Sequence, residues 1–256
     1  MEFASICYNN SFLNQVIIRT DFLEFIPTDK LFNDKIILPV LKHFPKKGKP
    51  QMIKFQNVNF VIDENSATTN TDISNGIQQE FSNINNNKVI LSNKYLILEI
   101  NQYTSYERTS TVFSEILSSL FSVMPLTSSR TGIRYINIYE DGQLRLSKDL
   151  FNNQIGPSVN RKLSAKENDL ICIRNMTLKE YRIKEKVLNF RYGMFNPEYP
   201  NAMKHAAFVL DYDCYTEDSL VGFESIMSHI KEGHGAIQYL FEDSITDKLR
   251  KIMKDE

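Results

Sequence analysis

The stretch RTGIRYINIYE, residues 130–140, has the alternation of a β-strand with apolar residues on both faces, yet an arginine and an asparagine lie inside it. With a period of two, one face carries Arg130, Gly132, Arg134, Ile136 and Ile138, and the other carries Thr131, Ile133, Tyr135, Asn137 and Tyr139. A buried polar group without a partner costs roughly 1–3 kcal/mol. The stretch therefore predicts a central strand whose polar side chains have defined partners.

Arg134, Asn137 and Glu99 form the first candidate site. Glu99 is a suitable partner for Arg134 if their strands lie side by side. In that interpretation an ion pair and an amide network set the register of the strands. The alternative interpretation is that Arg134 and Asn137 line a pocket for an anionic ligand.

Strand-like and helix-like segments surround this stretch. Residues 15–22, 50–63, 88–103, 170–183, 186–195 and 206–216 have strand composition. Residues 107–124 place Phe113, Ile116 and Leu120 on one stripe, which is typical of a helix packed on a sheet, and Ser105 is a suitable cap. We expect an α+β fold, with antiparallel β-meander sheets and packed amphipathic helices.

Two segments resemble each other, and they suggest an internal organisation. LILEINQYT (96–104) and FVLDYDCYT (208–216) are each followed by an amphipathic helix, which predicts two related lobes. We expect an N-terminal β-rich lobe with one long helix over residues 1–150. A C-terminal lobe of strands followed by helices would occupy residues 151–256, with Gly233 ending the first of those helices. The asparagine-rich residues 63–87 predict long turns between strands.

Composition and charge restrict the functional class. The chain has 256 residues, 42% of them hydrophobic and 24% charged, with a formal net charge of -1, so no overall basic field attracts nucleic acid or anionic lipid. The longest apolar runs, such as YLILEI, are too short to span a bilayer. Cys7, Cys172 and Cys214 are odd in number and far apart. This pattern, with no secretory signal at the start, predicts a soluble cytoplasmic protein.

The chain resembles a sporadically distributed family of uncharacterised bacterial and archaeal proteins. The resemblance rests on YNNSFLNQVIIRTDF, YTSYERTSTVFSEI, RTGIRYINIYE, FVLDYDCYT with its LDxD pattern, and HGAIQYLFEDSITDKLR with its FEDSIT segment, all in family order. Tyr106 stands where many members have tryptophan. The family has no agreed activity, and its scattered distribution is similar to that of anti-phage defence genes.

Asp211, Asp213 and Glu217 are the catalytic candidates. Asp211 and Asp213 are two residues apart on a strand, so their carboxylates project from one face about 7 Å apart, a spacing that metal-dependent phosphoryl transfer can use. Carboxylates at a strand end also serve as turn and cap groups, and the pattern alone is common. We expect no cofactor, apart from a divalent metal at Asp211 and Asp213 if the protein is a nuclease or phosphotransferase.

A lysine-rich loop supplies the nucleic-acid candidates. Lys42, Lys46, Lys47 and Lys49 could contact a phosphate backbone, although no sequence-reading element accompanies them. A solvated loop is the simpler interpretation.

The missing catalytic signatures favour binding over catalysis. We expect a non-catalytic, macromolecule-binding component of an anti-phage defence or toxin-control module. Its expected partner is another protein, with a nearby gene as the candidate source. The metal-dependent enzyme and nucleic-acid binding are the two alternatives, and no membrane contact is expected.

Overall fold

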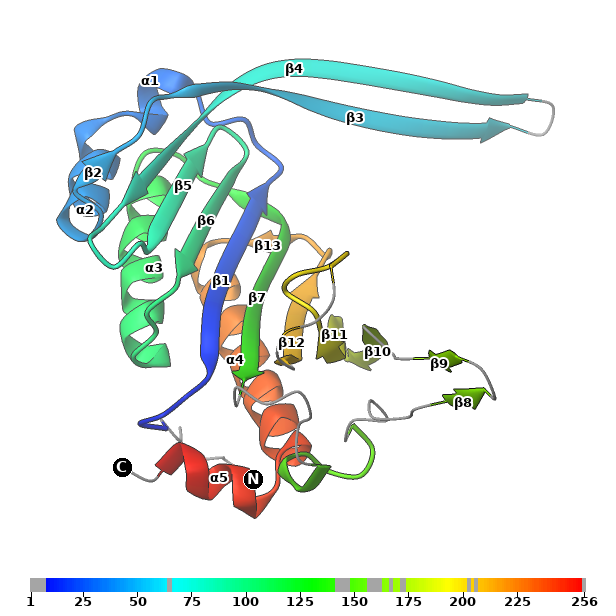
Figure 1. Cartoon of the computed structure of the whole chain (residues 1–256). Helices are drawn as coiled ribbons and strands as arrows, with labels where there is room; N and C mark the ends of the chain where they lie inside the picture. The colour runs from blue at the N-terminus through cyan, green and yellow to red at the C-terminus, as the bar shows by residue number, and fades with distance from the viewer. Residues whose placement is uncertain are drawn as a thin grey trace.

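One large antiparallel sheet forms the centre of the molecule (Figure 1). The computed structural model describes residues 8–63, 66–140, 148–155, 163–165, 168–170, 174–201, 204 and 207–254. Eleven of the strands described there join in this sheet. From one edge to the other it contains β10 (Asn175–Ile183), β11 (Lys186–Phe195), β12 (Ala207–Thr216), β7 (Thr127–Glu140), β1 (Leu13–Phe22), β6 (Tyr95–Ile100), β5 (Lys88–Ser92), β4 (Ser66–Ser82) and β2 (Lys46–Lys47).

Two strands lie off this path, and a small hairpin is separate from the sheet. The former are β13 (Leu220–Val221), which pairs with β7, and β3 (Gln51–Asp63), which pairs with β4. The hairpin consists of β8 (Leu163–Ala165) and β9 (Asn168–Leu170). The expected α+β class is confirmed, with a meander-like sheet in a single piece.

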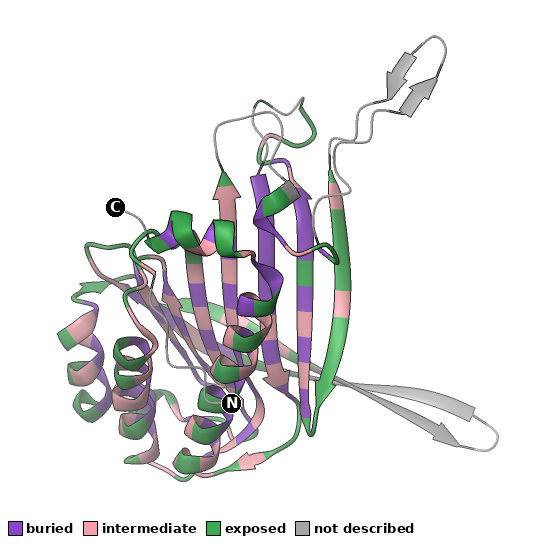
Figure 2. Cartoon of the chain, turned by 90° about the horizontal axis from the view of Figure 1, so that it is seen from below, coloured by how far each residue is buried: buried purple, intermediate pink, exposed green. Residues whose placement is uncertain are grey.

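The helices pack against one face of the sheet (Figure 2). They are α1 (Thr28–Leu31), α2 (Asp34–His43), α3 (Tyr106–Phe121), α4 (Phe223–Ser244), α5 (Asp247–Lys254) and the 3-10 helix η1 (Lys148–Leu150). The predicted cap of α3 is confirmed, because Ser105 Oγ accepts a hydrogen bond of 3.2 Å from Arg108 N. Phe113, Ile116 and Leu120 are fully or almost fully buried along its stripe. That stripe belongs to the hydrophobic core between helices and sheet.

Helix α4 continues past the point at which the sequence predicted its end. It runs from Phe223 to Ser244, straight through Gly233, so the expected stop at that glycine is wrong. A Cβ atom at Gly233 would lie 3.0 Å from Ile133 Cγ2 and 3.4 Å from Cys214 Sγ. Gly233 therefore allows α4 to approach β7 and β12 closely, and packing rather than chain reversal explains it.

The side chains of β1 show how the two faces of the sheet differ. Val16, Ile18, Thr20 and Phe22 are buried under the helices. Ile17, Arg19 and Asp21 alternate with them and point to the opposite face, where their exposure is intermediate. No described helix covers that second face, which we call the open face.

Strands β3 and β4 form a long two-stranded arm, which corrects the expectation of turns across residues 63–87. Residues 51–63 of β3 pair with residues 66–78 of β4, and only residues 78–82 of β4 pair with β5. The arm projects away from the sheet (Figure 1). The 13 residues of β3 span about 40 Å at about 3.3 Å per residue. The backbone pairing with β3 forms these strands despite a composition typical of loops.

Strands from both expected lobes share the one sheet. β7, within residues 1–150, pairs along ten positions with β12, within residues 151–256. The two similar segments contribute β6 and β12, which α3 and α4 follow. The lobe boundary and the duplication stay predictions.

Cys214 is buried, and burial raises the pKa of its thiol to about 11, whereas Cys7 and Cys172 lie outside the described residues.

Candidate functional site on the open face of the sheet

The predicted alternation of β7 is confirmed, and it separates two residues that the sequence had placed in one candidate site. Arg134 lines a cavity on the open face, and Asn137 lines another cavity on the helix side. Because they point to opposite faces, they do not line a common anion pocket, and that interpretation is wrong. The Asn137 side chain is buried, and its Nδ2 donates a 3.2 Å hydrogen bond to Leu210 O of β12.

The partner of Arg134 is Asp211, not Glu99. Arg134 Nε and Nη2 each donate a 2.7 Å hydrogen bond to one oxygen of the Asp211 carboxylate. The condition for a pair with Glu99 is not met, because β1 lies between β6 and β7 and places Ile17 opposite both Glu99 and Arg134. The bidentate geometry is the strongest form of such a pair. The predicted structural ion pair therefore exists, with a different acid.

Asp211 and Asp213 point to the same face, as predicted, but arginines surround them. Arg191 Nη1 lies 3.6 Å from Asp211 Oδ2, and Arg130 Nη2 lies 3.9 Å from Asp213 Oδ2. Burial raises the pKa of Asp213, while Arg130 and Arg134 partly offset that effect. The Asp211 side chain is only 8% exposed, and Arg134 pairs with it there.

Metal binding by this acidic pair would require a rearrangement. Both Asp211 oxygens already accept hydrogen bonds or lie close to a guanidinium. Glu217 is exposed at the end of β12 and does not complete the set. Over the described part of the chain, no group of three or more His, Cys, Asp or Glu side chains could hold a metal ion. The arrangement found here is that of an ion-pair network.

A cavity of about 260 Å³ opens beside this network, and we call it the arginine basin. It is lined by Ile17, Arg19, Ile97, Glu99, Arg130, Gly132, Arg134 and Asp213. Gly132 allows the close approach of β12 at this point, because a Cβ atom there would lie 2.7 Å from Tyr215 Cβ. The lining of the basin therefore combines two isoleucines with charged side chains of both signs.

Two arginine–tyrosine contacts flank the arginine basin. The Arg19 guanidinium lies 5.2 Å from the Tyr95 ring centre, and Arg130 lies 4.6 Å from that of Tyr215. Arg19 also donates hydrogen bonds of 2.8–3.1 Å to Asp21. The sequence reasoning missed Arg19 and Tyr95. The alternation of charged and apolar residues in VIIRTD of β1 could have identified Arg19 as a candidate. The register of β1 against β7, which brings Arg19 to the basin, requires the structure.

The lysine-rich loop lies at the other edge of the sheet. Lys46 and Lys47 are exposed and form β2, which is separated from the arginine basin by β4 and β5. Lys42 Nζ lies 2.7 Å from Glu115 Oε1, so its charge is partly neutralised. Lys49 is exposed beside them. These lysines and the arginine basin are therefore separate surfaces.

The root of the arm is attached to the open face. Phe55 of β3 packs edge-on against Phe25 and against Tyr95, with ring centres 6.4 and 6.3 Å apart. The Tyr95 hydroxyl donates to Gln78 Oε1 of β4. Tyr95 thus contacts both the arm and Arg19, which links the arm mechanically to the arginine basin.

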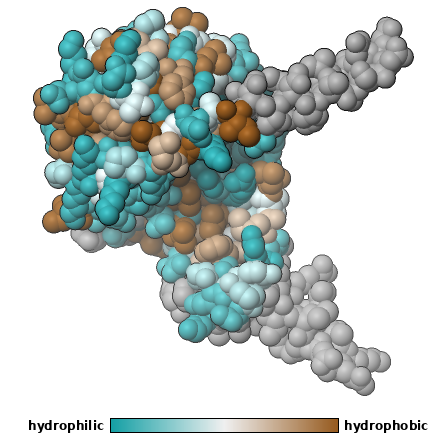
Figure 3. Space-filling view, turned by 90° about the horizontal axis from the view of Figure 1, so that it is seen from above, coloured by the Kyte–Doolittle hydropathy of each residue, from teal (hydrophilic) through white to brown (hydrophobic). Residues whose placement is uncertain are grey.

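Asn93 joins the arm to the N-terminal part of the chain. This fully buried residue accepts a 2.5 Å hydrogen bond from Ile77 N at its Oδ1 and donates a 2.7 Å bond from its Nδ2 to Ile26 O. At this end of the molecule, which Figure 3 views from above, hydrophobic residues are interleaved with hydrophilic ones. Leu23, Met52 and Ile73 are more than half exposed.

Comparison of the chain with protein-family models, with curated proteins and with solved structures found no match. Among the described helices, none is both long and apolar enough to cross a membrane.

Proposed function

We propose that the protein is a non-catalytic binding component that holds another protein against its open face. The supporting observation is the uncovered surface around the arginine basin, where arginines and tyrosines are only partly exposed and already oriented by neighbours. Arginine and tyrosine dominate the binding energy of many protein interfaces. Pre-oriented side chains lose little freedom on binding, which favours affinity.

The charge balance of the open face favours a protein over nucleic acid as the ligand. Across the neighbouring strands, Arg19, Arg130, Arg134 and Arg191 alternate with Asp21, Glu99, Asp211 and Asp213. Nucleic-acid binding relies on an excess of positive charge that neutralises phosphates. A balanced pattern instead gives pairwise complementarity with a protein surface that itself carries both signs.

The arm provides a second reason to expect a partner. An isolated two-stranded hairpin is marginally stable in water, and the outer part of the arm has no third strand among the described residues. A partner seated on the open face would also contact the arm root through Tyr95 and Phe55. The arm and the arginine basin would then act as one binding surface.

A role within an anti-phage defence or toxin-control module is part of this proposal. Its support is the family resemblance and the scattered distribution of that family. A partner encoded close to this gene is the candidate that follows from such a module.

The proposal is tested by affinity capture from the native host at moderate salt, with nuclease treatment as a parallel arm. We expect a stoichiometric protein partner that Arg130→Ala weakens by about tenfold, since central interface arginines often contribute 1.4 kcal/mol or more. The double variant Lys46→Ala/Lys47→Ala is the control. Its two lysines lie on the edge strand β2, away from the arginine basin, and it should retain the partner. Capture that both variants weaken equally, or that nuclease abolishes, would overturn the proposal.

The metal-dependent nuclease or phosphotransferase remains the alternative, supported by the shared orientation of Asp211 and Asp213. It predicts Mn²⁺ binding in calorimetry that disappears in Asp211→Asn/Asp213→Asn. Nucleic-acid binding through Lys42, Lys46, Lys47 and Lys49 predicts instead a steep fall of affinity with salt.

A further inference from the structure

A second cavity lies on the opposite, helix-covered side of the sheet, and its walls are mainly aromatic. It has a volume of about 110 Å³ and is lined by residues of the N-terminal segment, of β7 and α4, and of the start of α3 with the segment before it. A single water needs roughly 10–15 Å³ by the same kind of measure, so the cavity has room for a small organic group. We call it the aromatic pocket; its rings are Tyr8, Phe12, Tyr103, Tyr106, Tyr135 and Phe241.

The rings of the aromatic pocket stand at steep angles to one another, as the walls of a box do. Tyr103 and Tyr135 have ring centres 5.8 Å apart and planes at 78°. Tyr8 and Phe241 are 6.4 Å apart with planes at 63°. Such edge-to-face contacts hold the rings rigidly, and the electron-rich faces of aromatic rings attract cations.

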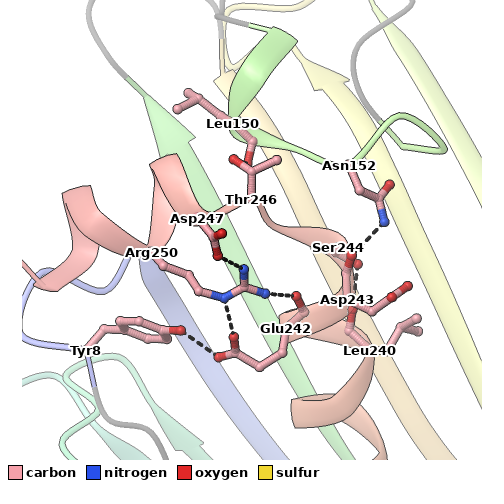
Figure 4. A network of polar contacts seen from close by, with 10 residues as sticks. All are labelled: Tyr8, Leu150, Asn152, Leu240, Glu242, Asp243, Ser244, Thr246, Asp247 and Arg250. Carbon is pink, nitrogen blue, oxygen red and sulfur yellow. Dashed lines mark hydrogen bonds and ion pairs between the residues drawn. The ribbon is translucent and has the colours of Figure 1, made fainter.

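One carboxylate supplies the net charge of this pocket. Glu242 is the charged side chain among the described lining residues, and it is 8% exposed. Its Oε1 accepts a 2.7 Å hydrogen bond from the Tyr8 hydroxyl, and its Oε2 a 2.9 Å bond from Arg250 Nε (Figure 4). Arg250 therefore pairs with Glu242 and also with Asp247, whose side chain is 92% exposed and whose charge is screened by solvent.

Tyr8 favours a positively charged occupant, and His234 does not oppose one. Donation of the Tyr8 hydroxyl to a carboxylate increases the electron density of its ring. His234 stacks on Tyr106, with ring centres 3.9 Å apart and planes at 3°, and contacts the Tyr135 hydroxyl at 2.9 Å. Burial lowers the pKa of His234 to about 4, so it is neutral near pH 7 and does not repel a cation.

We infer that the aromatic pocket binds a small organic cation, an alkylated ammonium group whose charge is spread over its methyl groups. The ring box provides cation–π attraction and apolar contact, and Glu242 is the charged side chain among its described lining residues. An inorganic divalent cation is disfavoured, because Glu242 is the single carboxylate among the described lining residues and sites for Ca²⁺ and Mg²⁺ rely on carboxylate oxygens. This inference is independent of the protein partner proposed for the open face.

The test uses the full-length protein and two probes of nearly equal shape, choline and its uncharged analogue 3,3-dimethyl-1-butanol, in titrations followed by NMR at constant ionic strength. We expect saturable choline binding that is at least about tenfold tighter than binding of the alcohol, because only the charged probe gains cation–π attraction. Contacts between the choline methyl protons and the Tyr103 and Tyr135 ring protons should accompany it. Equal binding of both probes, or no binding of choline, would overturn the inference.

Variants at Tyr103 separate ring chemistry from general packing. Tyr103→Leu removes the ring and should weaken choline at least about tenfold, whereas Tyr103→Phe keeps the ring and should remain within about threefold. Melting temperatures report whether each variant is folded, and the NMR contacts in the unchanged protein test the site without any substitution. Choline binding that Tyr103→Leu leaves intact in a folded protein contradicts the assignment. Arg130→Ala, on the open face, should leave choline binding unchanged.

Discussion

Arg134 of β7 and Asp211 of β12 form a bidentate ion pair between neighbouring strands, with both hydrogen bonds 2.7 Å long. Asp211 is 8% exposed and Arg134 is 33% exposed, so the pair lies at the boundary between interior and solvent. Removing one partner of a fully buried pair costs roughly 3–5 kcal/mol. Arg134 is partly solvated, so we expect Arg134→Ala to lower the free energy of unfolding by roughly 2–3 kcal/mol, measured by urea denaturation.

The double variant Arg134→Met/Asp211→Leu is the control for this pair. It removes both charges together, and apolar pairs often replace buried ion pairs without loss. It should therefore be more stable than Arg134→Ala alone. If Arg134→Ala unfolds at the same urea concentration as the unchanged protein, the pair contributes nothing to stability.

Gly233 and Gly235, two residues apart in α4, should respond oppositely to alanine. A Cβ atom at Gly233 would meet Ile133 Cγ2 at 3.0 Å, whereas nothing lies within 4 Å of one at Gly235. Alanine is favoured over glycine in a helix interior by about 0.8–1.0 kcal/mol. We expect Gly235→Ala to raise the melting temperature and Gly233→Ala to lower it. A rise in both variants would show that α4 does not pack as closely on β7 as described.

Stability should fall in mild acid because of two histidines, buried His229 and partly buried His234. Burial lowers the pKa of both His229 and His234 to about 4. An unfolded histidine titrates near about 6.5, so protonation favours the unfolded state, and the stabilising effect is complete above that pH and lost as pH falls toward 4. Each histidine should lower the free energy of unfolding by about 2 kcal/mol between pH 7.5 and pH 5.

Urea unfolding of His229→Gln and His234→Gln at both pH values checks this expectation. Each single variant should lose part of the difference in unfolding free energy between pH 7.5 and pH 5. The double variant should lose most of it. An unaltered difference between pH 7.5 and pH 5 in the double variant would assign the effect to other groups.

Asn93 should be the most sensitive polar residue at the arm root. Its amide satisfies Ile77 N and Ile26 O in a site without exposed surface. Each buried group left without a partner costs about 1–3 kcal/mol, so we expect Asn93→Ala to lower the free energy of unfolding by roughly 2–4 kcal/mol. Asn75→Ala, at an exposed position of β4, is the matched control and should change it by less than about 0.5 kcal/mol.

The arm itself can be removed at a defined point. Gln51 and Gln78 face each other across β3 and β4, and their side chains share a 2.9 Å hydrogen bond. Ile53 and Gly76 also face each other, so replacing residues 54–75 by Asn-Gly should close a short hairpin and keep Ile77, which is bonded to Asn93. We expect the core to melt within a few degrees of the unchanged protein, while capture of the proposed partner is lost. Undiminished capture would confine the binding surface to the arginine basin.

Local patterns in the chain were sufficient for most elements and for the faces of individual strands. The alternation of residues 130–140 predicted which side chains of β7 share a face, and the stripe after Ser105 predicted α3 with its cap. These features depend on residues close together in the chain, because side-chain periodicity and N-cap hydrogen bonds both involve neighbours a few residues apart. Asp211 and Asp213 were placed on a common face for the same reason.

Long-range register decided what the sequence could not. Because β1 lies between β6 and β7, Arg134 pairs with Asp211 and not with the expected Glu99. Pairing of β3 with β4 turned an asparagine-rich segment into an arm, and the close contact of Gly233 with β7 carried α4 past its expected end. The aromatic pocket joins residues 8 and 242, which no local pattern relates. The sequence by itself thus determined periodicity and capping, while the order of the strands, set by burial of the whole core, determined which polar groups meet.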